Sequence, residues 1–398
     1  MAEKTKILIL GYYLPGYKVG GPLVSILNII KNLSEDFNFL VITPDRDFGE
    51  NKPYPNVQRN KWLDLNSVLV YYIAPNFFSP IVLVNQIRKK ADNQTVVYVN
   101  SVFNFLFSIS VALAKRLGLV KIDNLIIAPR GELFDAALGF KNSQKSFFIW
   151  FAKAINLYKN VLWHATTENE QDFIVKKLGI DPLNIRIALI MSSISDADEQ
   201  NDNRDTLIIE NKDSSLRIIF LARISKDKNI LFTLEILKQV TVPVVFDIYG
   251  PNEEPELWGI CQEKIKALPS NIVVNYLGVV NRENVKKTLQ QYDLFFLPTF
   301  AENFGHAIAE SLSVGTPVLL SDNTPWRNLE NERLGWDISL GNPDLFVKAI
   351  YQVASYSYEQ RIENREYIKK IIKKRLSNPE ILNANRNLFT LPFKKQQD

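Results

Sequence analysis

The residue types best suited to chemistry gather between Glu302 and Glu310. After an apolar run at 294–298, the chain reads Glu302-Asn303-Phe304-Gly305-His306. A helix beginning near 303–305 would present amides without an intrahelical acceptor and the positive end of its dipole, which suit a phosphate or a sugar hydroxyl. Glu302 and Glu310, about two turns apart, could bind hydroxyl groups of two sugars. Acids at this spacing are common, so taken alone they favour a capping Glu302 and a solvated Glu310.

Two further features of this segment bear on ligand binding. Gly305 lets a ligand approach the backbone closely because it has no side chain. His306 and Glu310 are four residues apart and share one helix face, whereas Ile308 and Leu312 form another that can pack inward. His306 fits a hydrogen bond to a ligand and helix packing equally well.

The elements that must position these residues alternate between short apolar strands and helices. In the front half we expect strands at 6–10, 37–43, 68–73, 95–99, 125–128, 161–165 and 185–190, and helices at 23–33, 80–90, 103–117, 145–158 and 169–178. In the back half we expect strands at 217–222, 244–249, 272–276, 294–298 and 317–321, and helices at 230–240, 255–268, 283–292, 305–314, 344–356 and 358–374. Near-continuously apolar strands are typical of a parallel sheet covered on both faces.

The sequence therefore predicts two Rossmann-like, doubly wound α/β domains with a cleft between them. The expected bounds are 1–191 for the first domain, 192–215 for a polar linker and 216–357 for the second domain. A charged helical segment at 358–398 follows, and its return to the first domain is left open. Ligands of such sheets bind outside the carboxyl ends of the strands.

Composition sets the broad class. A chain of 398 residues that is 46% hydrophobic and 23% charged can bury two cores. The single cysteine, Cys261, excludes an internal disulfide and fits a reducing compartment. No apolar run approaches the ~20 residues of a membrane span, and the first run is too short for a signal peptide. We expect a cytoplasmic protein, with a position at the inner face of the cell membrane left open.

Charge is divided unevenly along the chain. Residues 1–190 hold 22 Lys and Arg against 15 Asp and Glu, and the remainder holds 25 against 28. A basic front half suits an anionic partner, such as a membrane surface or a phosphorylated acceptor, and fits chance variation equally well. Nucleic acid is not an expected partner, because no basic run with interleaved aromatic residues of that kind is present.

The order of several motifs resembles a known family. Glu302 and Glu310 within Glu-Asn-Phe-Gly-His, followed by Gly315-Thr316-Pro317-Val318, resemble the signature of retaining glycosyltransferases of family four, the glycosyl transferases group 1. The resemblance covers most of the chain, because these stretches follow in the family's order: Gly20-Gly21, Pro129-Arg130-Gly131-Glu132, His164-Ala165-Thr166-Thr167, Leu221-Ala222-Arg223 with Lys228, Ile248-Tyr249-Gly250, Tyr276-Leu277-Gly278 and Ser321-Asp322. It implies the GT-B fold.

The resemblance also implies roles for the back half. Arg223 and Lys228 would contact the donor diphosphate and neutralise it as it leaves. Glu302 would bind the donor sugar and Glu310 the ribose. The remaining donor contacts would come from the amides of Asn303, Phe304 and Gly305, from His306 and from Gly250. The family usually has glycine where Ala222 stands, and the extra methyl could tighten the donor site.

In the front half the resemblance places the acceptor side. Gly20 and Gly21 would lie beside the acceptor and the leaving group. Arg130 could hold an acceptor phosphate or hydroxyl, and Glu132 could orient the attacking hydroxyl, although ion pairing within the fold accounts for both equally well. His164 is interpreted as structural.

Neither a metal nor another cofactor is expected. Asp45-Arg46-Asp47 and Asp196-Ala197-Asp198 have the Asp-x-Asp form that other glycosyltransferases use for a metal ion. One follows a predicted strand and the other lies in the linker, so both are interpreted as solvated turns.

A basic aromatic stretch stands apart from these motifs. It consists of Lys141, Lys145, Phe147, Phe148, Trp150, Phe151 and Lys153. Such a helix could rest on an anionic membrane that presents a lipid-linked acceptor. A core-facing helix with exposed lysines is the interpretation that the pattern favours.

The expected function is metal-independent transfer of a hexose-type sugar, with retention, from a nucleotide-sugar to a hydroxyl of a glycan or lipid-linked oligosaccharide. Bacterial surface polysaccharide synthesis is the expected process. A UDP-sugar is favoured only because UDP is the commonest nucleotide of such donors. The alternatives are a glycan phosphorylase or nucleotide-sugar epimerase on the same fold, and an inactive binding subunit. The sequence leaves the sugar, the linkage, the acceptor and the oligomeric state open.

Overall fold

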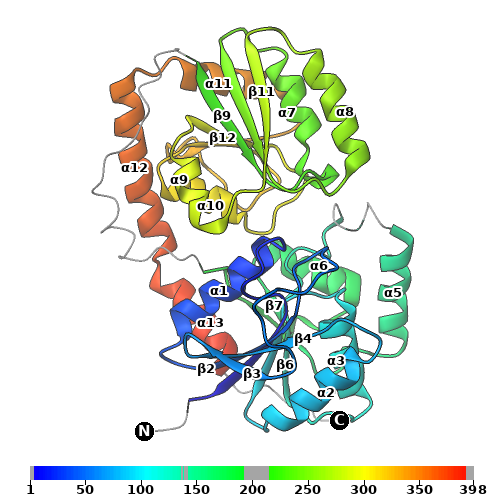
Figure 1. The fold of residues 1–398 in the computed structure, drawn as a ribbon. Helices are drawn as coiled ribbons and strands as arrows, with labels where there is room; N and C mark the ends of the chain where they lie inside the picture. The colour runs from blue at the N-terminus through cyan, green and yellow to red at the C-terminus, as the bar shows by residue number, and fades with distance from the viewer. Residues whose placement is uncertain (1–3, 136–137, 139–141, 192–214, 391–398) are drawn as a thin grey trace. The chain divides into compact units, whose positions relative to one another are not determined.

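The computed structural model describes residues 4–135, 138, 142–191 and 215–390. Contacts within the chain divide it into unit 1, Met1–Ser193 with Asn378–Asp398, and unit 2, Ile194–Ser377. Each unit is a parallel-sheet α/β domain (Figure 1), which confirms the predicted fold class. The predicted linker lies outside the described residues except for Ser215.

Unit 1 is built on a mostly parallel sheet. Within its described residues the sheet has eight strands in the order β3-β4-β2-β1-β5-β6-β7-β8, and only the β3–β4 pair is antiparallel. The strands are β1 (Lys6–Leu10), β2 (Asn38–Pro44), β3 (Trp62–Leu65), β4 (Val68–Ile73), β5 (Val96–Val99), β6 (Asn124–Ile127), β7 (Leu162–Ala165) and β8 (Ile185–Ile187).

Helices cover both faces of this sheet. They are α1 (Gly21–Leu33), α2 (Ser79–Lys90), the π-helical turn η1 (Phe105–Ile109), α3 (Ser110–Arg116), α5 (Asn142–Ala154), α6 (Glu168–Leu178), the 3-10 turn η2 (Pro182–Asn184) and α13 (Pro379–Thr390). Side chains alternate along each strand, so Leu8 and Leu10 join the core under α2, α3, α5 and α6. Ile7 and Ile9 join the opposite core, which α1 and α13 complete.

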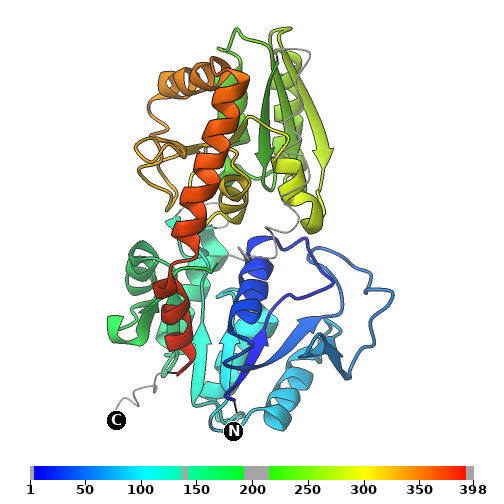
Figure 2. The same ribbon diagram turned by 90° about the vertical axis from the view of Figure 1, so that its left-hand side faces the viewer.

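The last helix is anchored in unit 1. Asn385 donates to the Leu189 carbonyl oxygen at 2.8 Å, and Arg386 pairs with Asp36 at 2.9 Å. The Phe389 ring centroid lies 5.6 Å from that of Tyr98. Figure 2 shows α13, the red helix near the C-terminus, lying against unit 1. The helical segment expected from 358 onwards therefore divides: α12 (Tyr358–Leu376) belongs to unit 2, and the chain returns to unit 1 from Asn378.

Unit 2 has a wholly parallel sheet. Its described strands run in the order β11-β10-β9-β12-β13-β14, with bounds β9 (Leu216–Leu221), β10 (Val244–Tyr249), β11 (Ile272–Gly278), β12 (Leu294–Leu297), β13 (Val318–Ser321) and β14 (Gly335–Ile338). The helical elements are η4 (Lys226–Lys228), α7 (Ile230–Leu237), α8 (Pro255–Lys266), η5 (Arg282–Asn284), α9 (Val285–Leu289), α10 (His306–Ser313), α11 (Pro343–Ala354) and α12. The strand order reverses between β9 and β12, and ligands of open α/β sheets bind at such a point, outside the carboxyl ends of the strands.

Two edge strands, a separate last helix and the 3-10 turns η2 and η4 were not predicted. β3 and β14 are four-residue edge strands, and β3 is half exposed, so neither shows the long apolar run of a central strand. α13 is distinct from α12 because Asn378-Pro379 interrupts the helix, and the residue before a proline is disfavoured in helical conformation. The predicted helix at 283–292 is shorter, as η5 and α9, and the strand predicted at 185–190 ends at Ile187.

One glycine holds two strand ends of unit 2 together. Gly250 directly follows β10 with φ +142°, and its amide donates to the Gly278 carbonyl oxygen at 2.8 Å. A Cβ at this position would lie 1.8 Å from the Ala222 carbonyl oxygen. Gly250 therefore lets the loop after β10 lie against the loop after β9, which carries Arg223.

Substitution of Gly250 by alanine is expected to lower the free energy of unfolding of unit 2 by about 2 kcal/mol or more, because the methyl group collides with backbone. Gly259 offers a matched control: it lies within α8 with nothing within 4 Å of its added Cβ. Gly259→Ala should raise stability by about 0.5–1 kcal/mol through helix propensity. Denaturant unfolding of both variants measures the difference, and equal effects would contradict it.

Candidate active site

The predicted donor residues meet at the carboxyl edge of the unit 2 sheet. Arg223 and Lys228 follow β9, and Glu302 follows β12. These strands pair directly, with Leu294 opposite Ile218 and Phe295 opposite Ile219. The two loops therefore come together at the point where the strand order reverses.

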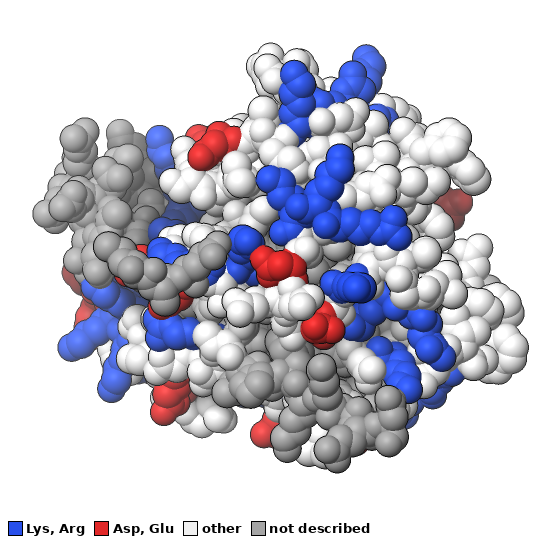
Figure 3. Space-filling model, turned by 90° about the horizontal axis from the view of Figure 1, so that it is seen from below, with Lys and Arg blue, Asp and Glu red and all other residues white. Residues whose placement is uncertain are grey.

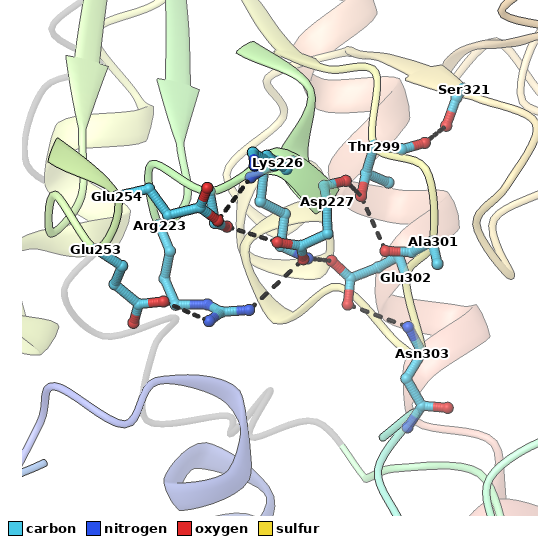
Figure 4. A network of polar contacts seen from close by, with 12 residues as sticks. Arg223, Lys226, Asp227, Glu253, Glu254, Thr299, Ala301, Glu302, Asn303 and Ser321 are labelled. Carbon is cyan, nitrogen blue, oxygen red and sulfur yellow. Dashed lines mark hydrogen bonds and ion pairs between the residues drawn. The ribbon is translucent and has the colours of Figure 1, made fainter. Parts of the chain in front are cut away.

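Charged side chains from these loops form one network (Figure 4). Lys228 Nζ lies 2.9 Å from Glu302 Oε2 and 3.4 Å from Asp227 Oδ2. Arg223 places Nη2 3.5 Å from Asp227 Oδ2 and Nη1 2.6 Å from Glu253 Oε2. Asp227 thus stands between both cations.

The network keeps its members charged. Burial lowers the pKa of Lys228, but Glu302 and Asp227 outweigh it and leave that pKa raised. Burial raises the pKa of Asp227, yet Lys228 and Arg223 bring it below its ordinary value. The pKa of Arg223 is raised by Asp227 and Glu253 against the opposing effect of burial. At neutral pH the loop therefore carries two fixed positive charges among carboxylates.

Hydrogen bonds to backbone carbonyl oxygens join the two loops. The Thr299 hydroxyl lies 2.8 Å from the carbonyl oxygens of both Asp227 and Ala301. The Phe300 amide donates to the same Asp227 oxygen at 2.8 Å. Ser321, at the end of β13, donates from its hydroxyl to the Thr299 carbonyl oxygen at 2.5 Å. The loop with the cations is thereby fixed to the loop with Glu302.

The helix after Glu302 begins slightly later than predicted. α10 starts at His306, and Gly305 is its N-cap with φ +78°. A Cβ on Gly305 would lie 2.5 Å from Ile308 Cδ1 and 3.2 Å from Glu302 Cγ. The Asn303 amide donates to Glu302 Oε1 at 3.1 Å. Glu302 therefore does not cap α10, which has no side-chain cap, and its carboxylate instead contacts the Asn303 amide and Lys228.

Phe304 and His306 belong to the start of this helix. The Phe304 carbonyl oxygen accepts from Trp326 Nε1 at 2.5 Å. The rings of Phe304 and His306 meet edge to face, with centroids 5.0 Å apart. Phe304 is buried, whereas His306 is only partly buried.

Glu310 lies further along α10 and has an arginine partner that the sequence did not identify. Arg282 Nη1 is 3.4 Å from Glu310 Oε1. Burial raises the pKa of Glu310, although Arg282 and Lys286 oppose the shift. The Glu310 side chain is 20% exposed and paired with Arg282, so it is less solvated than its spacing alone would favour.

A pocket adjoins Arg282 at the ends of β10 and β11. Its volume is about 400 Å³. It is lined by Tyr249, Val279, Val280, Asn281, Asn284, Lys287, Thr288 and Gln291. Its lining offers an aromatic ring and amide groups next to the Arg282–Glu310 pair.

In unit 1, Gly20 and Gly21 begin α1 and Arg130 follows β6. Gly20 is the N-cap with φ +67°, and no side chain caps the helix. Arg130 Nε donates to Asn100 Oδ1 at 2.6 Å, and the Asn100 amide donates to the Pro22 carbonyl oxygen at 2.8 Å. Asn100 therefore connects Arg130 to the start of α1.

A buried hydrogen-bond chain fixes the other side of Arg130. Its Nη2 donates to the Tyr98 hydroxyl at 2.5 Å, and that hydroxyl lies 2.9 Å from His164 Nδ1. His164 Nε2 lies 2.8 Å from the Ala188 carbonyl oxygen, so Nε2 carries the proton and Nδ1 accepts from Tyr98. Both ring nitrogens are used within the fold, as the structural interpretation of His164 predicts.

Arg130 itself lacks a carboxylate partner among the described residues. Its Nη1 is buried without a hydrogen-bond partner there. Its backbone has φ +55°, a left-handed conformation that is unusual for a residue with a side chain. Arg130 thus stands at the carboxyl edge of the unit 1 sheet, on a left-handed backbone and with one guanidinium nitrogen unpaired among the described residues.

Glu132 makes contacts inside unit 1. Its Oε2 accepts from the Val102 amide at 2.6 Å, and its Oε1 accepts from the Ser101 hydroxyl at 2.8 Å. Burial raises its pKa, and these donors only partly offset the shift. The carboxylate therefore orders the loop after β5.

The first Asp-x-Asp stretch is not a solvated turn. Asp45 and Asp47 are both buried. Asp45 pairs with Arg46 at 2.8 Å, and Asp47 accepts from the Tyr17 amide at 2.9 Å. The prediction failed because a charged turn buries its carboxylates when donors from other loops reach them. The second stretch, at 196–198, lies outside the described residues, and among the described ones no group of three or more His, Cys, Asp or Glu is placed to hold a metal.

Sequence reasoning missed Asp227, Glu253 and Arg282. Asp227 lies between Arg223 and Lys228 in the chain, so its position was a usable signal. Glu253 and Arg282 follow strands β10 and β11, and only the strand order shows that β10 lies beside β9 and that β11 lies beside β10.

The buried chain predicts an unusual titration of His164. Burial first, and Arg130 second, lower its folded-state pKa to about 3 from an ordinary 6.5. Between these values the unfolded state binds a proton that the folded state does not, so stability falls as pH falls through this window, by up to roughly 1.4 kcal/mol per pH unit. Because the chain has 2 histidines, a His306→Gln variant leaves one imidazole to follow by NMR, and a midpoint near 6.5 would contradict this arrangement.

Comparison with known proteins identifies the fold. Residues 202–375 match the family model described as Glycosyl transferases group 1. No curated protein matches the sequence. HepE from Anabaena, in complex with UDP and glucose, aligns with TM-score 0.66 and 16% identity over 96% of this chain and 98% of that chain.

Two further structures agree. WaaG, a glycosyltransferase involved in lipopolysaccharide biosynthesis, gives TM-score 0.65 and 12% identity over 97% of this chain and 100% of that chain. The lipopolysaccharide outer core galactosyltransferase WaaB gives TM-score 0.60 and 15% identity over 96% of this chain and 99% of that chain. The chain therefore has the GT-B glycosyltransferase fold, and its residues 202–375 are similar to the glycosyl transferases group 1.

Proposed function

We propose that this protein is a retaining glycosyltransferase of family four that transfers a hexose-type sugar from a nucleotide-sugar to a hydroxyl of a glycan or lipid-linked acceptor. The observation that carries the proposal is the pair of cations, Arg223 and Lys228, fixed beside Glu302 where the strand order reverses between β9 and β12. The match of this segment to group 1 glycosyltransferases supports it.

The donor would occupy three neighbouring parts of unit 2. Its diphosphate would bind at Arg223 and Lys228, and its ribose hydroxyls at Glu310. The pocket beside Arg282 would take the base, since Asn281 and Asn284 can hydrogen bond to it. The amides of Asn303, Phe304 and Gly305 would contact the sugar and the phosphate at the start of α10.

Exposure distinguishes the two cations. The Arg223 side chain is 45% exposed, whereas that of Lys228 is 12% exposed and lies against Glu302. Arg223 would therefore meet an incoming diphosphate first and exchange its contact with Glu253 for the phosphate. Lys228 would hold Glu302 in place, and its buried positive charge would add to that of Arg223 at the diphosphate.

The proposed mechanism needs no protein nucleophile. The bond between the anomeric carbon and the diphosphate oxygen breaks, and the acceptor oxygen attacks from the same face. The acceptor proton passes to an oxygen of the departing diphosphate. Arg223, Lys228 and the α10 amides would stabilise the charge that develops there. Because these groups provide the positive charge, we propose that no metal is needed, and turnover insensitive to EDTA would support this.

A UDP-sugar is the favoured donor. The similar protein HepE has been crystallised with UDP-glucose, with UDP and glucose, and with UDP. WaaG and WaaB belong to lipopolysaccharide synthesis by their descriptions. By analogy we propose polysaccharide or lipid-linked oligosaccharide assembly as the process, with Gly20, Gly21, Arg130 and Glu132 on the acceptor side.

Calorimetry with UDP, GDP and ADP is expected to show binding of UDP, because a UDP-sugar is the donor proposed above. Hydrolysis or transfer with each matching sugar donor then identifies the sugar, and product NMR establishes the anomeric configuration. Phosphate-dependent turnover would favour a phosphorylase, and product without an acceptor would favour an epimerase. Failure to bind any nucleotide would favour a binding subunit.

Arg223→Ala is expected to lower kcat on the order of 10²–10³-fold, the effect of losing one preorganised charge donor. Lys226→Ala is a matched control, since this exposed lysine lies in the same loop and only its amide joins the network, at 3.1 Å from Glu254. Steady-state rates for both variants test the role of Arg223. Near-wild-type turnover by Arg223→Ala would remove it from the mechanism.

A further inference from the structure

Helix α5 buries one face and exposes an aromatic one. Ala152 is buried in the unit 1 core, and Phe148 packs its ring edge to face with Phe103 at 5.9 Å. On the other side, Phe147 is 66% exposed, Trp150 64% and Phe151 45%. The expectation of a core-facing helix that exposes only lysines is therefore incomplete.

The exposed rings form one surface, the α5 aromatic face, defined by Phe147, Trp150 and Phe151. Residues three and four apart share a helix face, and the Phe147 and Trp150 rings have centroids 5.8 Å apart. Large apolar side chains gathered in water are unfavourable, and such a patch usually marks an interaction site. In Figure 1, α5 lies at the outer side of unit 1.

The apolar surface extends beyond the helix. Arg116, at the end of α3, donates from Nε to the Ile155 carbonyl oxygen at 3.4 Å, just past the end of α5. Leu117 and Leu119 follow Arg116 and are both exposed. Arg116 and the two exposed leucines therefore lie beside the C-terminal end of α5.

The sequence of this segment carries charge of one sign. Between Asp135 and Glu168 the sequence contains no acidic residue but four lysines, at 141, 145, 153 and 159. Of these, Lys153 is exposed in the last turn of α5. In the view of Figure 3, Lys and Arg side chains stand across the surface with a few Asp and Glu among them. Helices α2 and α3 both end in basic turns.

We propose that the α5 aromatic face is a docking surface for a bilayer that contains anionic phospholipids. Tryptophan and phenylalanine insert at the level of the lipid headgroups, and flanking lysines contact their phosphates. A second copy of the chain fits less well, because a symmetric contact would bring the same lysines together without acids to pair with them. The contact would be peripheral, since no helix of the described residues is long and apolar enough to cross a membrane.

The test measures cosedimentation of the full chain with two kinds of vesicle, phosphatidylcholine alone and phosphatidylcholine mixed with phosphatidylglycerol. The wild type is expected to bind the mixed vesicles. The triple variant Phe147→Ser, Trp150→Ser and Phe151→Ser should bind them about tenfold or more weakly, because the inserted apolar surface is lost. Lys153→Gln should weaken binding by about fivefold and reduce its salt dependence.

The matched control replaces three exposed apolar residues elsewhere, Leu183, Ile260 and Leu345, with serine. It should bind vesicles as the wild type does. UDP affinity and thermal unfolding of all variants are measured in parallel, so that loss of folding or failure of the donor-site proposal is recognised separately from loss of docking.

Three results would overturn the proposal. The first is absence of wild-type binding to the mixed vesicles. The second is equal binding of both vesicle types, which would remove the role of the lysines. The third is unchanged vesicle binding by the aromatic triple variant, including the case in which sedimentation shows a wild-type dimer that this variant lacks.

Discussion

The pairing of β9 with β12 is the constraint on which the candidate active site depends. Strands that are neighbours in the sheet but far apart in the chain deliver their following loops to the same edge. One loop carries Arg223 and Lys228, and the other carries Glu302 and the start of α10. Without this pairing, the residues that match glycosyltransferase motifs would be unrelated side chains.

Electrostatics then sets the state of the site. Two cations in a partly buried loop would repel each other, and Asp227 between them removes that cost. Glu253 and Glu302 complete the balance from the loops after β10 and β12. These acids keep the cations ionised and oriented, so a diphosphate would exchange one set of anionic contacts for another instead of creating a new arrangement.

Arg130 of unit 1 is held by different groups from those around Arg223 and Lys228. Arg130 is positioned by a neutral amide and a phenol, and its charge has no acidic partner among the described residues. The neutral His164 behind Tyr98 avoids a second positive charge in the same buried chain. The cations of unit 2 are thus balanced by carboxylates, whereas Arg130 in unit 1 is held by neutral groups.

The sequence by itself determined the fold class, most strands and helices, and the choice of Arg223, Lys228, Glu302 and Glu310 as candidate donor residues, because apolar periodicity and ordered motifs are local properties of the chain. Only the tertiary structure decided that Asp227, Glu253 and Arg282 join them, since contacts between loops depend on strand order. It also decided that Asp45 and Asp47 are buried, that α13 returns to unit 1, and that Phe147, Trp150 and Phe151 face outward. Each of these depends on what packs against a residue from elsewhere in the chain, which composition and spacing do not contain.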